Sequence, residues 1–334
     1  MKSLLEKIKD EELNKISDSL TRENKEVSIE NQFKIILEKF GNYDISFLWL
    51  LSYPYEHAPF AKNYIDQNYQ KFHQYLDSGF PKKISQKGKF NSHMWEMILC
   101  DLLSFSGELI PKSANGSDFL LKLNDKQEIQ IEAVCPDEAT DLELRSFRPV
   151  LSEEEPFYSG GGNIDDLERP ILLRSLKGFD QKAKLNKYDT NKPLIIAINS
   201  SNVVGLISND DYILRRMLFG LGNQTITRKP DNSFVSGLQY NPSLNKPGQQ
   251  EFPIARFLSS DYSHISGVIY TSQNPIGLVP DGYGWHNSGI FYAPNPNAKF
   301  KVNIDFPFFK KMICNTEIYK TQEAEEDFKG SVAT

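Results

Sequence analysis

Two acidic residues lie on neighbouring extended segments and could support metal or proton chemistry. Asp118 begins a β-rich run over 118–123, and Glu132 lies within a second run over 128–134. Turn-forming residues at 124–126 separate the runs, which predicts a hairpin. If this loop is centred on its middle residue, the register places Asp118 opposite Glu132 on the polar face of the hairpin.

Opposed carboxylates of this kind need a neutralising partner. Their Cβ atoms would lie about 4.5–5.5 Å apart, where like charges repel. A divalent cation is one answer, because Mg²⁺ prefers oxygen ligands and is held by one or two carboxylates with water and phosphate. A shared proton is the other answer. A glycoside hydrolase pair is disfavoured, because directly opposed residues would bring the carboxyl groups closer than the ~5 Å or more that such enzymes use.

Other polar residues in the same part of the chain extend this candidate site. Glu96 supplies a third acid on a predicted helix over 91–107, although a glutamate near a helix start is also favoured by the helix dipole. A basic helix is predicted over 171–188 and carries Arg174, Lys182 and Lys184. A basic helix is more often a solvated surface, so these cations need independent support.

The elements that must position these residues follow from the apolar periodicity. Helices are predicted over 1–76, a linker or basic loop over 78–89, and a buried strand over 194–199 that follows the basic helix. Two further strands are predicted over 264–270 and 289–293. The acidic, glycine-containing segment 136–170 is too long for a simple connection and is expected to be disordered or a functional flap.

Four of these motifs, taken in order, resemble the PD-(D/E)XK, or restriction-endonuclease-like, nuclease superfamily. The resemblance covers roughly residues 90 to 200. The matching pieces are His93-Met94-Trp95-Glu96, Gly116-Ser117-Asp118-Phe119, Ile131-Glu132-Ala133, and the helix with Arg174 and Lys182. It implies an α/β (α+β) fold with a central mixed sheet flanked by helices, preceded by an α-helical N-terminal region.

The resemblance also implies a set of site roles. Asp118, Glu132 and the backbone carbonyl of Ala133 would bind Mg²⁺ or Mn²⁺, with Glu96 supporting the metal or orienting its water. The family's lysine would stand at position 134, where this chain has Val134. The resemblance therefore gives the catalytic lysine role to Lys182.

Substrate contacts are implied on the same helix. Arg174 would contact the scissile phosphate, and Lys184 is a further candidate for substrate binding. Because two residues span about 200° of a helix, Lys182 and Lys184 cannot both point into one site. Lys182 is favoured.

Composition narrows the function classes. The net charge of -6, from 38 Lys and Arg against 44 Asp and Glu, argues against a protein that coats nucleic acid by bulk electrostatics, although a local basic groove is compatible with it. No apolar run approaches 18 residues, the first twenty residues lack an apolar leader, and the three cysteines form no CxxC pair. We expect a cytoplasmic chain with no membrane partner.

The resulting expectation is a Mg²⁺-dependent nuclease that hydrolyses DNA or RNA, with nucleic acid as its partner. The alternative is a nuclease-like scaffold without catalysis that binds nucleic acid or protein. The expected organisation is a helical region at 1–89, a core with long insertions at 90–320, and a flexible tail at 321–334.

Overall fold

The protein is described here from a computed structural model. The structure describes residues 44, 46–47, 50, 58–111, 116–123, 127–136, 164–203, 211–244, 252–278, 289–302, 304 and 310–311. Predictions made for the first forty residues, for most of the segment 136–170 and for the tail 321–334 lie outside these ranges.

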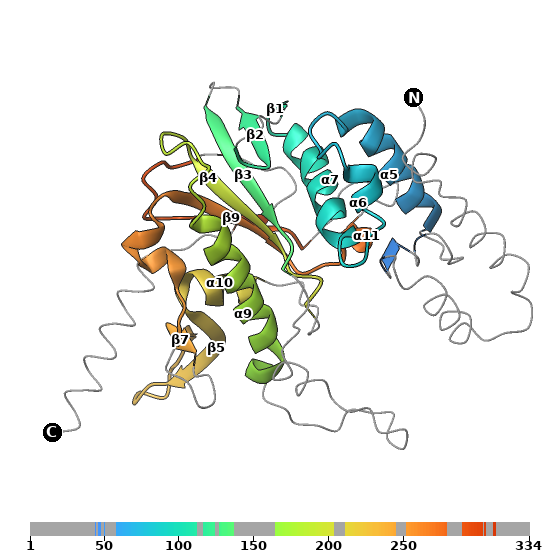
Figure 1. Cartoon of the computed structure of the whole chain (residues 1–334). Coiled ribbons are helices and arrows are strands. Elements are labelled where there is room, and N and C mark those ends of the chain that lie inside the picture. Colours follow the sequence, from blue (N-terminus) through green and yellow to red (C-terminus); the bar gives the residue numbers. More distant parts are fainter. Residues whose placement is uncertain are drawn as a thin grey trace, which may run out of the picture.

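A seven-stranded mixed sheet forms the centre of the molecule (Figure 1). Its strand order is β1-β2-β3-β4-β9-β10-β11. The central strands β3, β4 and β9 are parallel to one another. Strands β1 and β2 pair antiparallel with their neighbours, and β10 pairs antiparallel with β9 but parallel with β11. The strands are β1 (Glu108–Ile110), β2 (Phe119–Lys122), β3 (Glu128–Val134), β4 (Leu194–Asn199), β9 (Ile265–Thr271), β10 (Phe291–Pro294) and β11 (Lys310–Lys311).

Helices cover both faces of this sheet (Figure 1). Helix α7 (Phe90–Ser104) packs on one face, with α5 (Ala58–Phe72), α6 (Phe80–Lys83) and α11 (Pro275–Leu278) around it. Helices α9 (Ile164–Ala183) and α10 (Tyr212–Phe219) cover the other face. Strand β4 reads as a continuous apolar run because its side chains are buried on both faces. The predicted α/β class, with a mixed central sheet flanked by helices, is confirmed.

The predicted hairpin has the expected register. Phe119 pairs with Ile131, Leu121 with Ile129, and Lys122 with Glu128. The backbone N–H of Leu123 donates to the carbonyl of Gln127 at 2.9 Å and closes the turn. This register places Asp118 and Glu132 together at the start of the hairpin.

Some predicted boundaries were wrong. Helix α9 begins at Ile164 rather than 171 and contains Pro170, a residue that normally marks a helix start. It ends at Ala183 rather than 188, because the following residues turn back toward β3. The segment 78–89 is not simply a linker, since α6 lies within it and buries Phe80 completely.

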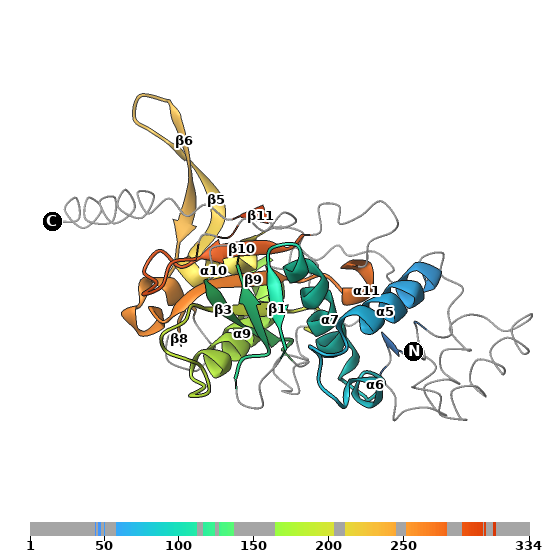
Figure 2. The same ribbon diagram turned by 90° about the horizontal axis from the view of Figure 1, so that it is seen from above.

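The region after β4 holds elements that the sequence did not predict. Helix α10 ends at Gly220, which has a positive φ of 70° and closes the helix. Strands β5 (Leu221–Arg228) and β6 (Phe234–Tyr240) follow as a hairpin that projects away from the body of the protein (Figure 2). The short strands β7 (Ser243–Leu244) and β8 (Phe252–Pro253) and two 3₁₀ turns, η1 (Arg256–Leu258) and η2 (Ser260–Tyr262), lead into β9.

Within the described ranges, no helix has the length and apolar content to cross a membrane. The cytoplasmic location stays a prediction.

Candidate functional site

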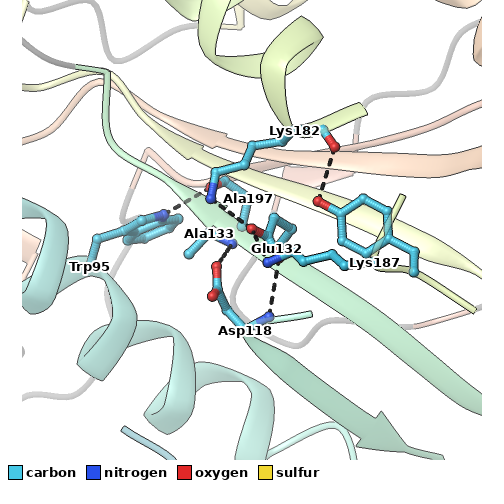
Figure 3. A network of polar contacts seen from close by, with 8 residues as sticks. Trp95, Asp118, Glu132, Ala133, Lys182, Lys187 and Ala197 are labelled. Atoms are coloured by element: carbon cyan, nitrogen blue, oxygen red, sulfur yellow. Dashed lines mark hydrogen bonds and ion pairs between the residues drawn. The ribbon is translucent and has the colours of Figure 1, made fainter. Parts of the chain in front are cut away.

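A fully buried carboxylate lies at the centre of the site (Figure 3). Glu132 on β3 has 0% of its side chain exposed, and its Oε1 accepts hydrogen bonds from Lys182 Nζ at 2.6 Å and from Lys187 Nζ at 2.8 Å. Burying a charge is costly unless it is paired and hydrogen-bonded. The two ammonium groups meet that requirement.

Asp118, the residue directly before β2, completes the cluster. Its backbone N–H donates to Glu132 Oε2 at 3.2 Å, and its own Oδ2 accepts the backbone N–H of Ala133 at 2.9 Å. Through these two hydrogen bonds, Asp118 is joined to β3 both at the Glu132 side chain and at the backbone of Ala133. The cluster therefore contains two carboxylates and two ammonium groups, and its formal charges balance.

Close helix packing brings Lys182 to this point. A Cβ built on Gly178 would lie 3.2 Å from Val134 Cγ2 and 3.3 Å from Pro136 Cγ, so α9 lies close to the end of β3 at this glycine, and a larger residue would require these side chains to shift slightly. Lys182 lies one helical turn beyond Gly178, over the middle of the strand. The Tyr188 hydroxyl donates to the Lys182 carbonyl at 2.9 Å and fixes the last turn of α9.

Tyr188 lies beside the two carboxylates. Its burial, followed by the charges of Glu132 and Asp118, raises the pKa of its hydroxyl well above the ordinary value. The phenol therefore stays protonated at every physiological pH. It acts as a hydrogen-bond donor and not as a base.

The predicted site residues have different positions in the structure. Asp118, Glu132, Ala133 and Lys182 come together as described above. Lys184 is exposed on the segment after α9, whereas Arg174 lies two turns before Lys182 on α9 and is half-buried. Glu96 lies on α7, against the opposite face of the sheet, where its Oε2 is 3.7 Å from His93 Nδ1 of the same helix.

Helix α7 contacts the site strands through its tryptophan. Trp95 is fully buried, and its Nε1 donates to the Ala197 carbonyl on β4 at 3.1 Å (Figure 3). Ala197 pairs with Ala133 on β3. Trp95 thus holds the strand pair from the face opposite to the lysines.

Lys187 is the site residue that sequence reasoning missed. It was counted within a basic helix that was predicted to run to residue 188, and nothing marked it as different from its neighbours. The structure places it in the connection from α9 to β4. The available signal was Glu132 itself, because a buried acid facing a basic segment requires cationic partners.

Donors of the protein engage the carboxylate oxygens of the predicted metal site. Both ammonium groups occupy Glu132 Oε1, and backbone N–H groups occupy Glu132 Oε2 and Asp118 Oδ2. No group of three or more His, Cys, Asp or Glu side chains suited to a metal ion occurs in the described ranges. Binding of Mg²⁺ or Mn²⁺ stays a prediction, and no step below depends on it.

Comparison with known proteins gives one distant relationship. A protein of Haemophilus influenzae named "Putative glycosyltransferase" is 23% identical over 261 residues, which cover 77% of this chain and 86% of that protein. No family model matches the chain. No solved structure matches it either.

This relationship overturns the nuclease assignment. The PD-(D/E)XK resemblance depended on four short motifs within roughly residues 90 to 200, and its lysine position holds Val134. The relationship to the glycosyltransferase-named protein spans 261 residues and points to a different superfamily. The predicted nuclease activity was therefore wrong, and the alternative of a nuclease-like binding scaffold falls with it. The restriction-endonuclease-like core is not confirmed, and nothing supports the predicted nucleic-acid partner.

Proposed function

We propose that the protein is a glycosyltransferase that uses a sugar donor activated by a nucleoside diphosphate. The observation that carries this proposal is the convergence of Lys182 and Lys187 on one buried carboxylate. The printed name of the Haemophilus influenzae relative supports the reaction class.

The two lysines suit the phosphate end of such a donor. An ammonium group has three N–H donors, and in the described part of the chain Glu132 takes one donor from each lysine. The side chains of Lys182 and Lys187 are 27% and 33% exposed, so both remain accessible to a ligand. Glu132 holds the two ammonium groups side by side, as a diphosphate requires.

Asp118 has the position of a proton acceptor. It is half-buried, and the Ala133 N–H fixes its carboxylate against β3, at the residue that follows Glu132. In the proposed transfer, the bond between the sugar C1 and the phosphate oxygen breaks and its electron pair leaves with the nucleoside diphosphate. A new bond forms between C1 and an acceptor hydroxyl oxygen, and the hydroxyl proton passes to Asp118.

The lysines would stabilise the leaving group. Negative charge grows on the departing diphosphate, and fixed cations near that charge lower the barrier more in a water-poor site than in bulk water. Both ammonium groups contact Glu132. Its role is to hold them in place.

The test is release of nucleoside diphosphate from a panel of UDP-, GDP- and CDP-sugars, with a mixture of sugar and lipid-linked acceptors. We expect Lys187→Met and Asp118→Asn to lower the release rate by about 100-fold or more. Lys184→Met is the matched control, because Lys184 is exposed on the same segment, and it should keep the wild-type rate.

Each assay is run with EDTA and with added Mg²⁺ or Mn²⁺, which also tests the metal prediction. Wild-type protein that releases no diphosphate from any donor under either condition would refute the proposal. Equal rates for wild type, Lys187→Met and Asp118→Asn would refute the assignment of the site.

A further inference from the structure

The segment that carries Lys187 connects the end of α9 at Ala183 to the start of β4 at Leu194. Most residues from 184 to 192 are exposed, and the apolar contact of this segment comes from Tyr188, which is half-buried against the second core. Lys187 nevertheless reaches Glu132 Oε1 at 2.8 Å. The Tyr188 contact lies on the α9 side of the connection, and a second contact holds the residues that follow it.

A buried amide on β3 supplies this second contact. Gln130 is 4% exposed, and its Nε2 donates to the Asp189 carbonyl at 2.9 Å while its Oε1 accepts the Asp189 N–H at 2.8 Å. The Gln130 backbone N–H also donates to the Pro193 carbonyl at 2.9 Å. Gln130 thus forms hydrogen bonds with the backbone of the connection at two residues, Asp189 and Pro193.

The geometry of the strand relates this clamp to the site. Gln130 and Glu132 are two residues apart on β3, so their side chains project from the same face. Asp189 and Lys187 are also two residues apart. The clamp at Gln130–Asp189 therefore aligns the connection with β3 so that Lys187 meets Glu132.

We infer that Gln130 is a positioning residue whose amide fixes Lys187 for binding of the donor diphosphate. The inference extends the function proposed above and rests on it for the identity of the ligand. Gln130 acts through the Asp189 backbone and Lys187, and it contacts neither the sugar nor the phosphate.

Loss of the clamp should release the connection without unfolding the protein. Gln130→Met keeps the length and volume of the side chain but removes both side-chain hydrogen bonds. Asp189 is exposed, so water can take over its N–H and carbonyl. The variant should therefore free residues 184–192 and leave β3 in place.

Two measurements test this without any need for catalysis. The first is the rate at which an amine-acylating reagent modifies each lysine, followed by peptide mass spectrometry. We expect Gln130→Met to raise the Lys187 rate about tenfold, as for the loss of roughly one net hydrogen bond, while Lys182 on α9 changes little. The second is hydrogen exchange, which should accelerate in peptides from 184–192 and stay unchanged in β4.

The matched control is Gln181→Met, the same substitution at an exposed position just before Lys182. It should leave the acylation and exchange patterns as in wild type. Faster exchange throughout β3 and β4 in Gln130→Met would indicate general destabilisation and would overturn the inference. An unchanged Lys187 rate would do the same.

Kinetics separate this inference from the proposed function. If the glycosyltransferase proposal holds, Gln130→Met should raise the donor KM about tenfold with a smaller change in kcat. Release of the connection in a protein that transfers no sugar would uphold the clamp and refute the function. Diphosphate release that Lys187→Met abolishes and Gln130→Met leaves intact would uphold the function and refute the clamp.

Discussion

The partners that neutralise the buried Glu132 carboxylate in the structure differ from those that the sequence predicted. Opposed acids at 118 and 132 required a neutralising partner, and a divalent metal ion or a shared proton was expected from the sequence. The structure brings two lysines from 50 and 55 residues away instead. Because Glu132 is fully buried, the free energy of the folded state depends on those ammonium groups.

This dependence should be cooperative between the two lysines. Lys182→Met or Lys187→Met leaves one ammonium on Glu132, and we expect each to lower the free energy of unfolding by about 1 kcal/mol. The double variant leaves a buried charge without its two lysine partners and should cost about 3–5 kcal/mol, more than the sum of the single effects. Urea unfolding of the four proteins measures this coupling.

Neutralising the acid provides the control. Adding Glu132→Gln to the double lysine variant removes the unpaired charge, so part of the lost stability should return. Simple additivity of the two lysine substitutions, with no recovery on adding Glu132→Gln, would show that Glu132 does not depend on them as a pair.

At the scale of elements, helices and strands with a strong apolar pattern could be predicted from the sequence. Contacts between elements that are distant in the chain could not. The hairpin register and the ranges of β3 and β4 followed from alternation and from a continuous apolar run. Helix α10 was not predicted, although its residues are amphipathic and Gly220 follows them as a C-cap. The β5–β6 hairpin lies in a stretch interrupted by turn-forming residues, which made its strands harder to recognise. The end of α9 was placed too late because the clamp that turns the chain is a contact with β3, which no local pattern encodes.

The same distinction explains the site. Glu132 and Lys182 lie on regular elements and Asp118 directly precedes β2, so their spacing predicted that they could meet. Lys187 lies on an irregular connection whose path depends on Gln130, 57 residues earlier in the chain. Its role could be seen only after the fold had brought these segments together.

A second group of polar contacts joins α9 to the short turns η1 and η2. Asp180 accepts two hydrogen bonds from the buried guanidinium of Arg256, at 2.8 and 2.7 Å, and one from the Tyr262 hydroxyl at 2.8 Å. Arg256 lies in η1 and Tyr262 ends η2. Both short turns are therefore tied to the helix that carries Lys182.

This contact predicts a dependence of stability on alkaline pH. Burial, followed by the hydrogen bond to Asp180, raises the pKa of Tyr262 from 10.0 to about 12. The unfolded chain therefore loses this proton before the folded protein does, so the contribution is complete below pH 10 and is lost as pH rises toward 12. Urea unfolding of wild type and Tyr262→Phe should show a difference that shrinks between about pH 10 and about pH 12. A constant difference would contradict this account.

At the scale of the whole molecule, one sheet separates two apolar cores. The first lies between the sheet and α5, α6 and α7, and the second lies between the sheet and α9 and α10. Strand β4 serves both, because Ile195 and Ala197 point into the first core and Ile196 and Ile198 into the second. The proposed site lies on the face of the second core, while Trp95 braces the same strands from the first.

A shared central strand should make the two cores unfold together. Ile195→Ala and Ile196→Ala remove completely buried side chains on opposite faces, and each should lower the free energy of unfolding by about 2–5 kcal/mol. In both variants, hydrogen exchange in α7 and in α10 should accelerate to the same extent, because neither layer keeps its strand partners when β4 is lost. Faster exchange confined to α7 in Ile195→Ala and to α10 in Ile196→Ala would show two independent units. If the two layers are independent, loss of the first core would leave the lysine cluster intact. If they unfold together, the cavity that Ile195→Ala leaves in the first core also weakens the site on the opposite face of the sheet.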